Sequence, residues 1–214
     1  EARSKFLDAA RRAGAEHRAW PHPLTGPAGE ALSTDTAWLG PRDASRVLVV
    51  ISGTHGVEGF CGSGPQVGLL RGDAGVALPA DTAMLSIHGI NPHGWAWLRR
   101  VTEENVDLNR NWVDFDAPLP ANPGYAALHP HLTPARLDAD ALAAAEGAQA
   151  AFVAEHGLHA ARVAASSGQY THPDGHFYGG SGPTWARRTS EAILAECLPR
   201  ARTVAIVDMH TGLG

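Results

Sequence analysis

The stretch Ser52-Gly53-Thr54-His55-Gly56-Val57-Glu58-Gly59 follows an apolar run, residues 47–51, that is rich in β-branched side chains. A run of this length predicts one buried strand, and the glycines after it favour a sharp turn with close backbone approach. His55 and Glu58 are three residues apart, so both side chains would lie on one face of the first turn of a following helix. Together they would make half of a zinc site. The alternative is a strand-to-helix turn whose polar residues only cap the helix.

Apolar runs alternate with helical patterns on both sides of this turn. Further strands are expected at residues 16–20, 34–39, 82–88 and 203–209, and helices at residues 2–13, 60–70, 137–155 and 184–198. Prolines predict a loop at residues 118–134, and a second long loop is expected at residues 166–183. This alternation predicts an α/β fold with an open, mostly parallel mixed sheet and helices on both faces. The length suits a single domain over residues 1–214.

The composition argues against several classes of protein. A net charge of -5 and no Lys/Arg block argue against a nucleic-acid-binding surface. No apolar run approaches the roughly 18 residues needed to span a bilayer, so we expect no membrane partner. Two cysteines, Cys61 and Cys197, form no disulfide framework and indicate a reducing, cytoplasmic location. The chain begins at Glu1 without an initiator methionine, which leaves open whether a leader was removed. The oligomeric state also stays open.

Polar side chains gather at the predicted ends of three strands. His55 and Glu58 follow the first, a turn at Asn91 follows the second, and His210 ends the last. Ligands bind at the carboxyl ends of strands in open α/β sheets. His55, Glu58 and His210 would supply two nitrogens and one carboxylate, leaving a fourth zinc position for water as catalytic sites do. Asp208 shares a strand face with His210, and a metal–histidine cluster would account for its burial. For His210 alone, a hydrogen-bonded core histidine is the alternative.

Three motifs occur in order along the chain. They are Gly53-Thr54-His55-Gly56-Val57-Glu58-Gly59, then Asn91-Pro92-x-Gly94 with Arg100 and Val106-Asp107-Leu108-Asn109-Arg110-Asn111-Trp112, and last Asp208-Met209-His210-Thr211-Gly212. The first resembles the His-x-x-Glu zinc motif of the zinc carboxypeptidases and their relatives, the succinylglutamate desuccinylases and aspartoacylases. The second is similar to the region of that superfamily that binds the substrate carboxylate, and the third resembles the segment with its third zinc ligand. Three motifs in order are specific, although each alone is short.

The resemblance extends from about Leu32 onward. The turn at residues 52–64 and the loop Phe177-Tyr178-Gly179-Gly180 look like those of an uncharacterised, carboxypeptidase-like branch of the superfamily, a domain of unknown function. Membership would imply a carboxypeptidase-like fold and one bound Zn²⁺.

The resemblance also implies a role for each matching residue. The zinc ligands would be His55, Glu58 and His210. Asn109 and Arg110 would hold the substrate carboxylate, and Arg100 would polarise the scissile carbonyl. Asp107 would form a hydrogen bond with a zinc-bound histidine. The planar donor fork of an arginine matches a carboxylate, and zinc with a second cation suits an oxyanion. The alternative for residues 107–112 is a solvated loop capped by its Asn and Asp side chains.

The chain departs from the superfamily pattern in two places. An Ala-rich insertion and a glycine-rich loop separate Trp112 from His210. The catalytic glutamate of the superfamily follows the third ligand, whereas this sequence stops at Gly214. We therefore expect that the C-terminal part of the family domain, with its general base, is absent. Amide hydrolysis would then be at least about a hundredfold slower than in a version extended past Gly214. If the base lies inside the chain, Glu104 is the first residue to test.

These observations predict a zinc-dependent hydrolase that cleaves an amide bond adjacent to a free carboxylate, through a zinc-activated water. Its partner would be a peptide or a small N-acyl amino acid with a free carboxylate. The alternative from a different class is a non-catalytic metal- or ligand-binding module that retains the fold. A serine hydrolase is disfavoured, because the sequence contains no Gly-x-Ser-x-Gly elbow.

Overall fold

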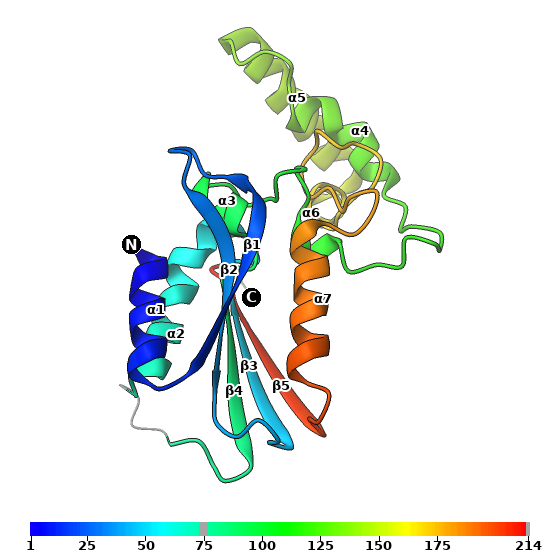
Figure 1. Ribbon diagram of the computed structural model, residues 1–214. Helices are drawn as coiled ribbons and strands as arrows, with labels where there is room; N and C mark the ends of the chain where they lie inside the picture. Colours follow the sequence, from blue (N-terminus) through cyan, green and yellow to red (C-terminus); the bar gives the residue numbers. More distant parts are fainter. Residues whose placement is uncertain (73–76, 213–214) are drawn as a thin grey trace. The chain divides into compact units, whose positions relative to one another are not determined.

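The computed structural model describes residues 1–72 and 77–212 (Figure 1). Its elements are α1 (Ala2–Arg12), β1 (Glu16–Thr25), β2 (Ala31–Leu39), β3 (Arg46–Ser52), η1 (Gly56–Glu58), α2 (Gly59–Arg71), β4 (Thr82–His88), α3 (Pro92–Ala96), η2 (Leu108–Arg110), α4 (Pro123–Leu132), α5 (Ala139–His156), α6 (Leu158–Ser166), α7 (Trp185–Cys197) and β5 (Thr203–Met209). Here η denotes a 3₁₀ helix. No helix in this part of the chain is long and apolar enough to cross a membrane.

The chain forms two compact units. The sheet unit comprises Glu1–Glu103 and Trp185–Gly214, and the inserted unit comprises Glu104–Thr184. All five strands belong to the sheet unit, whereas η2 and α4 to α6 belong to the inserted unit. The division into two compact units does not test whether residues 1–214 form the single domain expected from the sequence, which stays a prediction.

The five strands form one open, mixed sheet in the order β1-β2-β4-β3-β5. Strands β4, β3 and β5 are parallel neighbours, and β2 runs antiparallel to both β1 and β4. All strands except β2 therefore point the same way. Val50 of β3 pairs with Ser86 of β4 on one side and with Val207 of β5 on the other. The predicted α/β class with a mostly parallel mixed sheet is confirmed.

Helices cover both faces of the sheet. Helices α1 and α2 pack against one another and on one face, where they bury a core of small and apolar side chains: Phe6, Ala9, Ala10, Ala37, Val50, Val67, Leu70 and Met84. Helix α7 lies on the other face (Figure 1). Its contacts with β1 include an ion pair between Arg18 and Glu196 and an edge-on contact between His22 and Trp185. The sheet is therefore buried on both sides near its centre, as a parallel sheet requires.

Helix α2 is fixed to the sheet by a buried glutamine. The side-chain amide of Gln66 donates to the carbonyls of Val50 and Ile87, at 2.8 and 3.0 Å, and its oxygen accepts from the Ser52 hydroxyl at 2.8 Å. Gln66 is fully buried, so these bonds satisfy a group that would otherwise be costly to bury. They hold the middle of α2 against the last residues of β3 and β4.

One expected loop is wrong. Residues 118–134 contain helix α4, because Asn122 caps its N-terminus by accepting from the Tyr125 backbone N–H at 3.1 Å. Pro123 occupies the first helical position, where its missing N–H has no helical partner to lose. Helical structure after residue 137 is confirmed, as α5 and α6, which meet at Gly157 with φ of 85°.

Strand β1 is longer than expected. It continues past Trp20 through Pro21 and Pro23 to Thr25. It is an outer strand of the sheet, where a proline without an N–H breaks no ladder on its free side. The pairing with β2 becomes irregular between Pro21 and Thr25, which is where the prolines lie.

Candidate metal centre

The glycine-rich turn after β3 places His55 and Glu58. Gly53 has φ of +75°, a left-handed conformation that other residues adopt at a cost. His55 precedes the 3₁₀ turn η1, and Glu58 is its last residue, directly before α2. A Cβ atom on Gly56 would lie 2.1 Å from the backbone carbon of Gly94, so this turn rests directly on α3. The predicted strand, turn and helix are all present, and the glycines permit the close contact.

Strand β5 brings His210 to the same edge of the sheet. Ser52, the last residue of β3, pairs with Met209, the last residue of β5, in a parallel register. The segments that follow the two strands therefore leave the sheet side by side. His55 and His210 are 155 residues apart in the sequence, yet their rings meet edge-on with centroids 4.9 Å apart.

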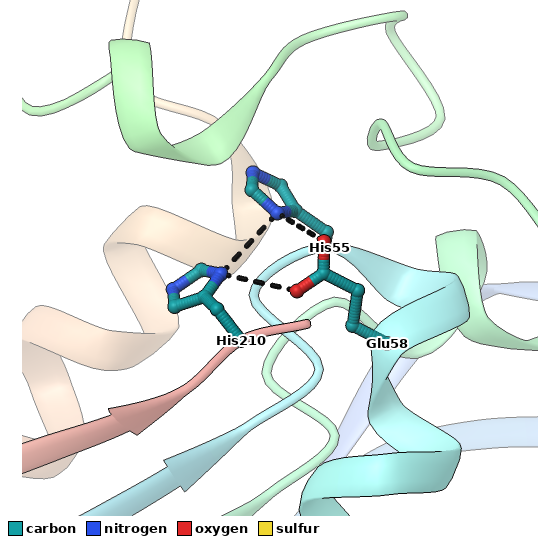
Figure 2. A group of neighbouring side chains, drawn as sticks. All are labelled: His55, Glu58 and His210. Carbon is teal, nitrogen blue, oxygen red and sulfur yellow. Dashed lines mark hydrogen bonds and ion pairs between the residues drawn. The ribbon is translucent and has the colours of Figure 1, made fainter. Parts of the chain in front are cut away.

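Ligand-type atoms of three residues converge at this edge (Figure 2). The Nδ1 atom of His55 lies 3.0 Å from Oε1 of Glu58, and Nδ1 of His210 lies 3.2 Å from Oε2. The two Nδ1 atoms are 3.3 Å apart. His55 and Glu58 are buried, whereas the His210 side chain keeps 29% of its exposure. We call these three residues the HEH cluster.

The spacing of the HEH cluster fits a tetrahedral metal ion. With metal–ligand bonds of about 2.0–2.1 Å, tetrahedral ligands lie about 3.3 Å from one another. The two histidine nitrogens are 3.3 Å apart, which matches that value, and each lies 3.0 or 3.2 Å from a different oxygen of Glu58. Two nitrogens and one carboxylate are also the ligand types that zinc accepts. The cluster can therefore hold one metal ion, and His210 gives it an opening towards solvent.

Glu58 is held in its ionised form. Burial raises the pKa of its carboxyl group, but a hydrogen bond from the Thr211 backbone N–H and the neighbouring His55 and His210 outweigh that effect. The net result is a pKa below the usual value for glutamate. The Thr211 bond is 2.8 Å long and reaches Oε2. A carboxylate that is already ionised at neutral pH is the form that binds a cation.

Arg100 lies beside the HEH cluster. Its Nη1 atom is 3.6 Å from Oε1 of Glu58, and its side chain is 42% exposed. Its position follows from the backbone, since the Gly56 N–H donates to the Arg100 carbonyl at 3.2 Å and the Val57 N–H donates to that of Arg99 at 3.1 Å. The arginine expected to act on a substrate carbonyl is therefore fixed next to the candidate ligands.

Asp208 contacts His210 directly, and Thr54 contacts Asp208. Asp208 Oδ2 lies 2.8 Å from His210 Nε2, and the Thr54 hydroxyl lies 2.9 Å from both oxygens of Asp208. The shared strand face of Asp208 and His210 was the sequence signal for the first contact. The contact of Thr54 was not expected, because its partner lies 154 residues away in the sequence.

The inserted unit contains the other expected site residues. Asp107 caps the short helix η2 and accepts from the Asn109 backbone N–H at 3.0 Å. Asn109 is exposed, and Arg110 is half-buried. The Arg110 Nη2 donates to the Ser166 carbonyl at 3.0 Å, while its Nε is buried without a hydrogen-bond partner among the described residues. No carboxylate in the described ranges pairs with this guanidinium, so its charge is not neutralised.

The expected site residues thus fall into two groups. The sheet unit brings together His55, Glu58, His210 and Arg100. The inserted unit brings together Asp107, Asn109 and Arg110 on one short segment. The roles assigned to the second group stay predictions.

These features define an α/β protein with a candidate metal centre at the carboxyl ends of two parallel strands. The chain belongs to the family described as "Protein of unknown function (DUF2817)", whose model matches residues 1–214. No curated protein matches the chain.

Three solved structures, all of glutaminyl cyclases, are similar to parts of the chain. The enzyme from Fimbriiglobus ruber is 12% identical, with 40% of this chain and 35% of that chain covered and a TM-score of 0.30. The Tannerella forsythia enzyme is 17% identical over 56% of this chain and 48% of that chain, with a TM-score of 0.34. The Porphyromonas gingivalis enzyme is 10% identical over 96% of this chain and 73% of that chain, with a TM-score of 0.35. The chain thus spans about a third of the length of the first enzyme and about half of the length of the second. Similarities this weak carry no functional argument.

Proposed function

We propose that this protein is a zinc-dependent hydrolase that cleaves an amide bond next to a free carboxylate. One observation carries the proposal: ligand-type atoms of His55, Glu58 and His210, one from each residue, all lie within 4.8 Å of one another, and the two histidine nitrogens are 3.3 Å apart. Three protein ligands leave a fourth tetrahedral position for water or substrate, which is the arrangement of catalytic rather than structural zinc sites. The resemblance of the three motifs to the zinc carboxypeptidases and aspartoacylases supports the same reaction class.

Each residue would have a distinct task. When bound, zinc would supply a Lewis acid and a water of lowered pKa. His55, Glu58 and His210 would hold it, and the Arg100 guanidinium would donate to the carbonyl oxygen as negative charge develops there. Asn109 and Arg110 of the inserted unit would bind the free carboxylate of the substrate. The unneutralised Arg110 suits that task, because a guanidinium offers two parallel donors to a carboxylate.

A non-catalytic metal- or ligand-binding module is the second candidate. The carboxylate of the cluster, Glu58, accepts from Thr211 and is a candidate ligand, and the neighbouring Asp208 is engaged by Thr54 and His210. Amide hydrolysis also needs a group that takes a proton from water and passes it to the leaving nitrogen. Neither carboxylate is free for that task, and this observation favours the second candidate.

Metal binding is the first test. The protein, stripped of metal by a chelator and titrated with zinc, should bind about one ion per chain. His210→Ala should abolish tight binding, because it removes one of three ligands. His159→Ala is the matched control, since His159 is exposed on α6, and it should bind zinc as the unaltered protein does. Full zinc occupancy in His210→Ala would overturn the assignment of the site.

Hydrolysis is the second test. The zinc-loaded protein is incubated with short peptides and N-acyl amino acids, each as the free acid and as the C-terminal amide. A hydrolase of the proposed class releases amine from the free acids, and its turnover is lost in His210→Ala. Binding of the free acids without turnover would instead support the non-catalytic module. Equal turnover of the free acids and their C-terminal amides would contradict recognition of a substrate carboxylate.

A further inference from the structure

A cavity of about 360 Å³ lies within the sheet unit. Its walls come from the first residues of α1 and β2, from Phe60 at the start of α2, from the end of β4, and from α3 with Leu98. We call it the Trp95 cavity, after the largest side chain in its lining. Its volume is at the lower end of the range for small-molecule sites, about 300–1,000 Å³. No residue of the HEH cluster is among its described lining residues, so it is a separate candidate site.

The indole ring of Trp95 is a fixed wall of this cavity. A Cβ atom on Gly59 would lie 2.5 Å from the ring, and Cβ atoms on Gly53 and Gly89 would lie 3.3 and 3.1 Å from it. The three glycines therefore leave the space that the ring fills, and such close packing holds it in one position. Phe60 meets Trp95 edge-on, with centroids 5.5 Å apart, and is 56% exposed. The two rings form an aromatic corner that a ligand does not need to reorganise.

The charged side chains of the Trp95 cavity leave one carboxylate that no cation neutralises. Arg3 lines the cavity but donates to both oxygens of the buried Asp35, at 2.6 and 3.1 Å, so its charge is balanced. Glu1 also lines it and pairs with Lys5 at 2.7 Å. Glu30 is exposed at the cavity, and it forms no ion pair in the described part of the chain. The remaining charge at the cavity is therefore negative, which disfavours an anionic ligand and favours a cation.

We propose that the Trp95 cavity binds an organic cation, an ammonium group that carries small alkyl substituents. The aromatic corner of Trp95 and Phe60 would attract the cation through the faces of its rings. The alkyl substituents would lose contact with water against the apolar lining, which includes Leu98. Glu30 would supply the opposite charge. His88 lines the inner end of the cavity, and burial lowers its pKa to about 4, so it adds no positive charge at pH 7.

Choline is the probe, and the NMR signal of its trimethylammonium protons is the readout. These protons should move upfield as metal-free protein is added, because protons above an aromatic face are shielded, and the titration gives the dissociation constant. Dimethylbutanol, the isostere in which carbon replaces the charged nitrogen, should bind about 3- to 30-fold more weakly. The carboxylate analogue tert-butylacetate should bind more weakly still, because Glu30 repels it.

Two variants test the two sources of attraction. Phe60→Leu keeps an apolar side chain but removes the ring, and it should weaken choline binding about 3- to 30-fold. Glu30→Gln removes the charge, while its amide oxygen can still accept from the Ala28 backbone N–H as the carboxylate does at 2.9 Å. It should weaken choline binding about 2- to 5-fold. Phe152→Leu and Glu155→Gln, on α5 of the inserted unit, are the matched controls and should bind choline as the unaltered protein does.

The outcomes separate this inference from the proposed function. His210→Ala should bind choline normally, because His210 does not line the Trp95 cavity. Loss of choline binding in that variant would assign the cation to the HEH cluster and overturn the inference. Equal binding of choline and its two analogues would also overturn it, as would an unchanged affinity in both Phe60→Leu and Glu30→Gln. Choline binding is measured without metal and without turnover, so the result does not depend on whether the protein hydrolyses an amide.

Discussion

The side chain of His88 lies at the end of β4, outside the HEH cluster. Its ring stacks on Phe6 of α1 with centroids 4.3 Å apart, and its Nε2 lies 2.9 Å from the Ser63 hydroxyl. Burial lowers the pKa of His88 to about 4, and the nearby Arg3 adds to the shift while Asp35 opposes it. The ring is therefore neutral in the folded protein at pH 7 and serves as a packing group whose Nε2 is paired with the Ser63 hydroxyl.

This shift predicts a dependence of stability on pH. His88 titrates near 6.5 in the unfolded chain and near 4 in the folded one, so its contribution is complete above pH 6.5 and is lost as the pH falls towards 4. Between pH 7 and pH 4.5 the loss should be about 2–3 kcal/mol. Urea unfolding at the two pH values measures it. In His88→Gln, whose side chain can still hydrogen-bond to Ser63, the titration of His88 is absent. The free energy of unfolding of this variant should therefore fall by about 2–3 kcal/mol less between the two pH values. An equal loss in both proteins would contradict the assignment.

Arg110 leads to a prediction about ligands. A charge-assisted hydrogen bond contributes about 1.5–3 kcal/mol, so Arg110→Ala should weaken binding of a free-acid peptide about 10- to 100-fold. Zinc content should not change. Arg136→Ala is the control, because Arg136 is 72% exposed and already paired with Asp138. If the unaltered protein binds the free acid and its C-terminal amide equally well, Arg110 does not recognise a carboxylate. Calorimetric titration measures both ligands.

A glycine of the turn and a glycine of α5 should respond differently to replacement by alanine. A Cβ on Gly56 would lie 2.1 Å from the backbone of Gly94, which cannot move without displacing α3. Gly56→Ala should therefore destabilise the fold by about 1–3 kcal/mol and weaken zinc binding, because His55 and Glu58 flank the displaced turn. Gly147→Ala is the contrasting change: outside its own stretch of helix α5, no atom lies within 4 Å of its Cβ position. It should stabilise by about 0.5–1 kcal/mol.

Urea denaturation of the two alanine variants tests this contrast, with zinc affinity as a second measurement. Equal effects on stability would mean that the turn does not depend on its contact with α3.

Elements with strong local patterns could be predicted from the sequence, and those fixed by capping could not. Residues 82–88 and 203–209 were expected as strands and form β4 and β5 with those bounds. Helix α4 was missed, because prolines normally break helices, whereas here Asn122 caps the helix and Pro123 occupies a tolerant position. The extension of β1 was missed for a related reason, since only its place at the sheet edge makes its prolines acceptable.

The candidate site divides in the same way. His55, Glu58 and His210 carry recognisable ligand chemistry at predicted strand ends, so their convergence could be predicted before the sheet order was known. Thr54 could not, because a threonine has no ligand signature and its partner Asp208 is distant in sequence. That contact depends on β3 and β5 being parallel neighbours, and only the sheet topology supplies this information.

Strand β5 gives the sheet an exposed apolar edge. Among the described residues it pairs with β3 on one side only, and Val204, Ile206 and Val207 are 40%, 56% and 43% exposed. Apolar edge strands with few charged side chains favour pairing between molecules, and β5 carries only Asp208 near its end. Ile206→Lys should therefore reduce concentration-dependent association, as measured by light scattering after size exclusion. Leu158→Lys, which changes an equally exposed leucine on α6, should have little effect. Unchanged association in Ile206→Lys would show that this edge is not the contact.

The register between β3 and β5 has a consequence for folding. In an unfolded chain His55 and Glu58 are neighbours, but His210 is 155 residues away from His55, so only a partial, weak site exists. Tight metal binding thus requires that the last strand has docked, a late event when contacts are so distant in sequence. A metal ion at 100 times its dissociation constant would then favour the docked state by about 2.7 kcal/mol. The bound ion would stabilise the docked position of β5. The backbone amide hydrogens of β5 should therefore exchange more slowly when zinc is present.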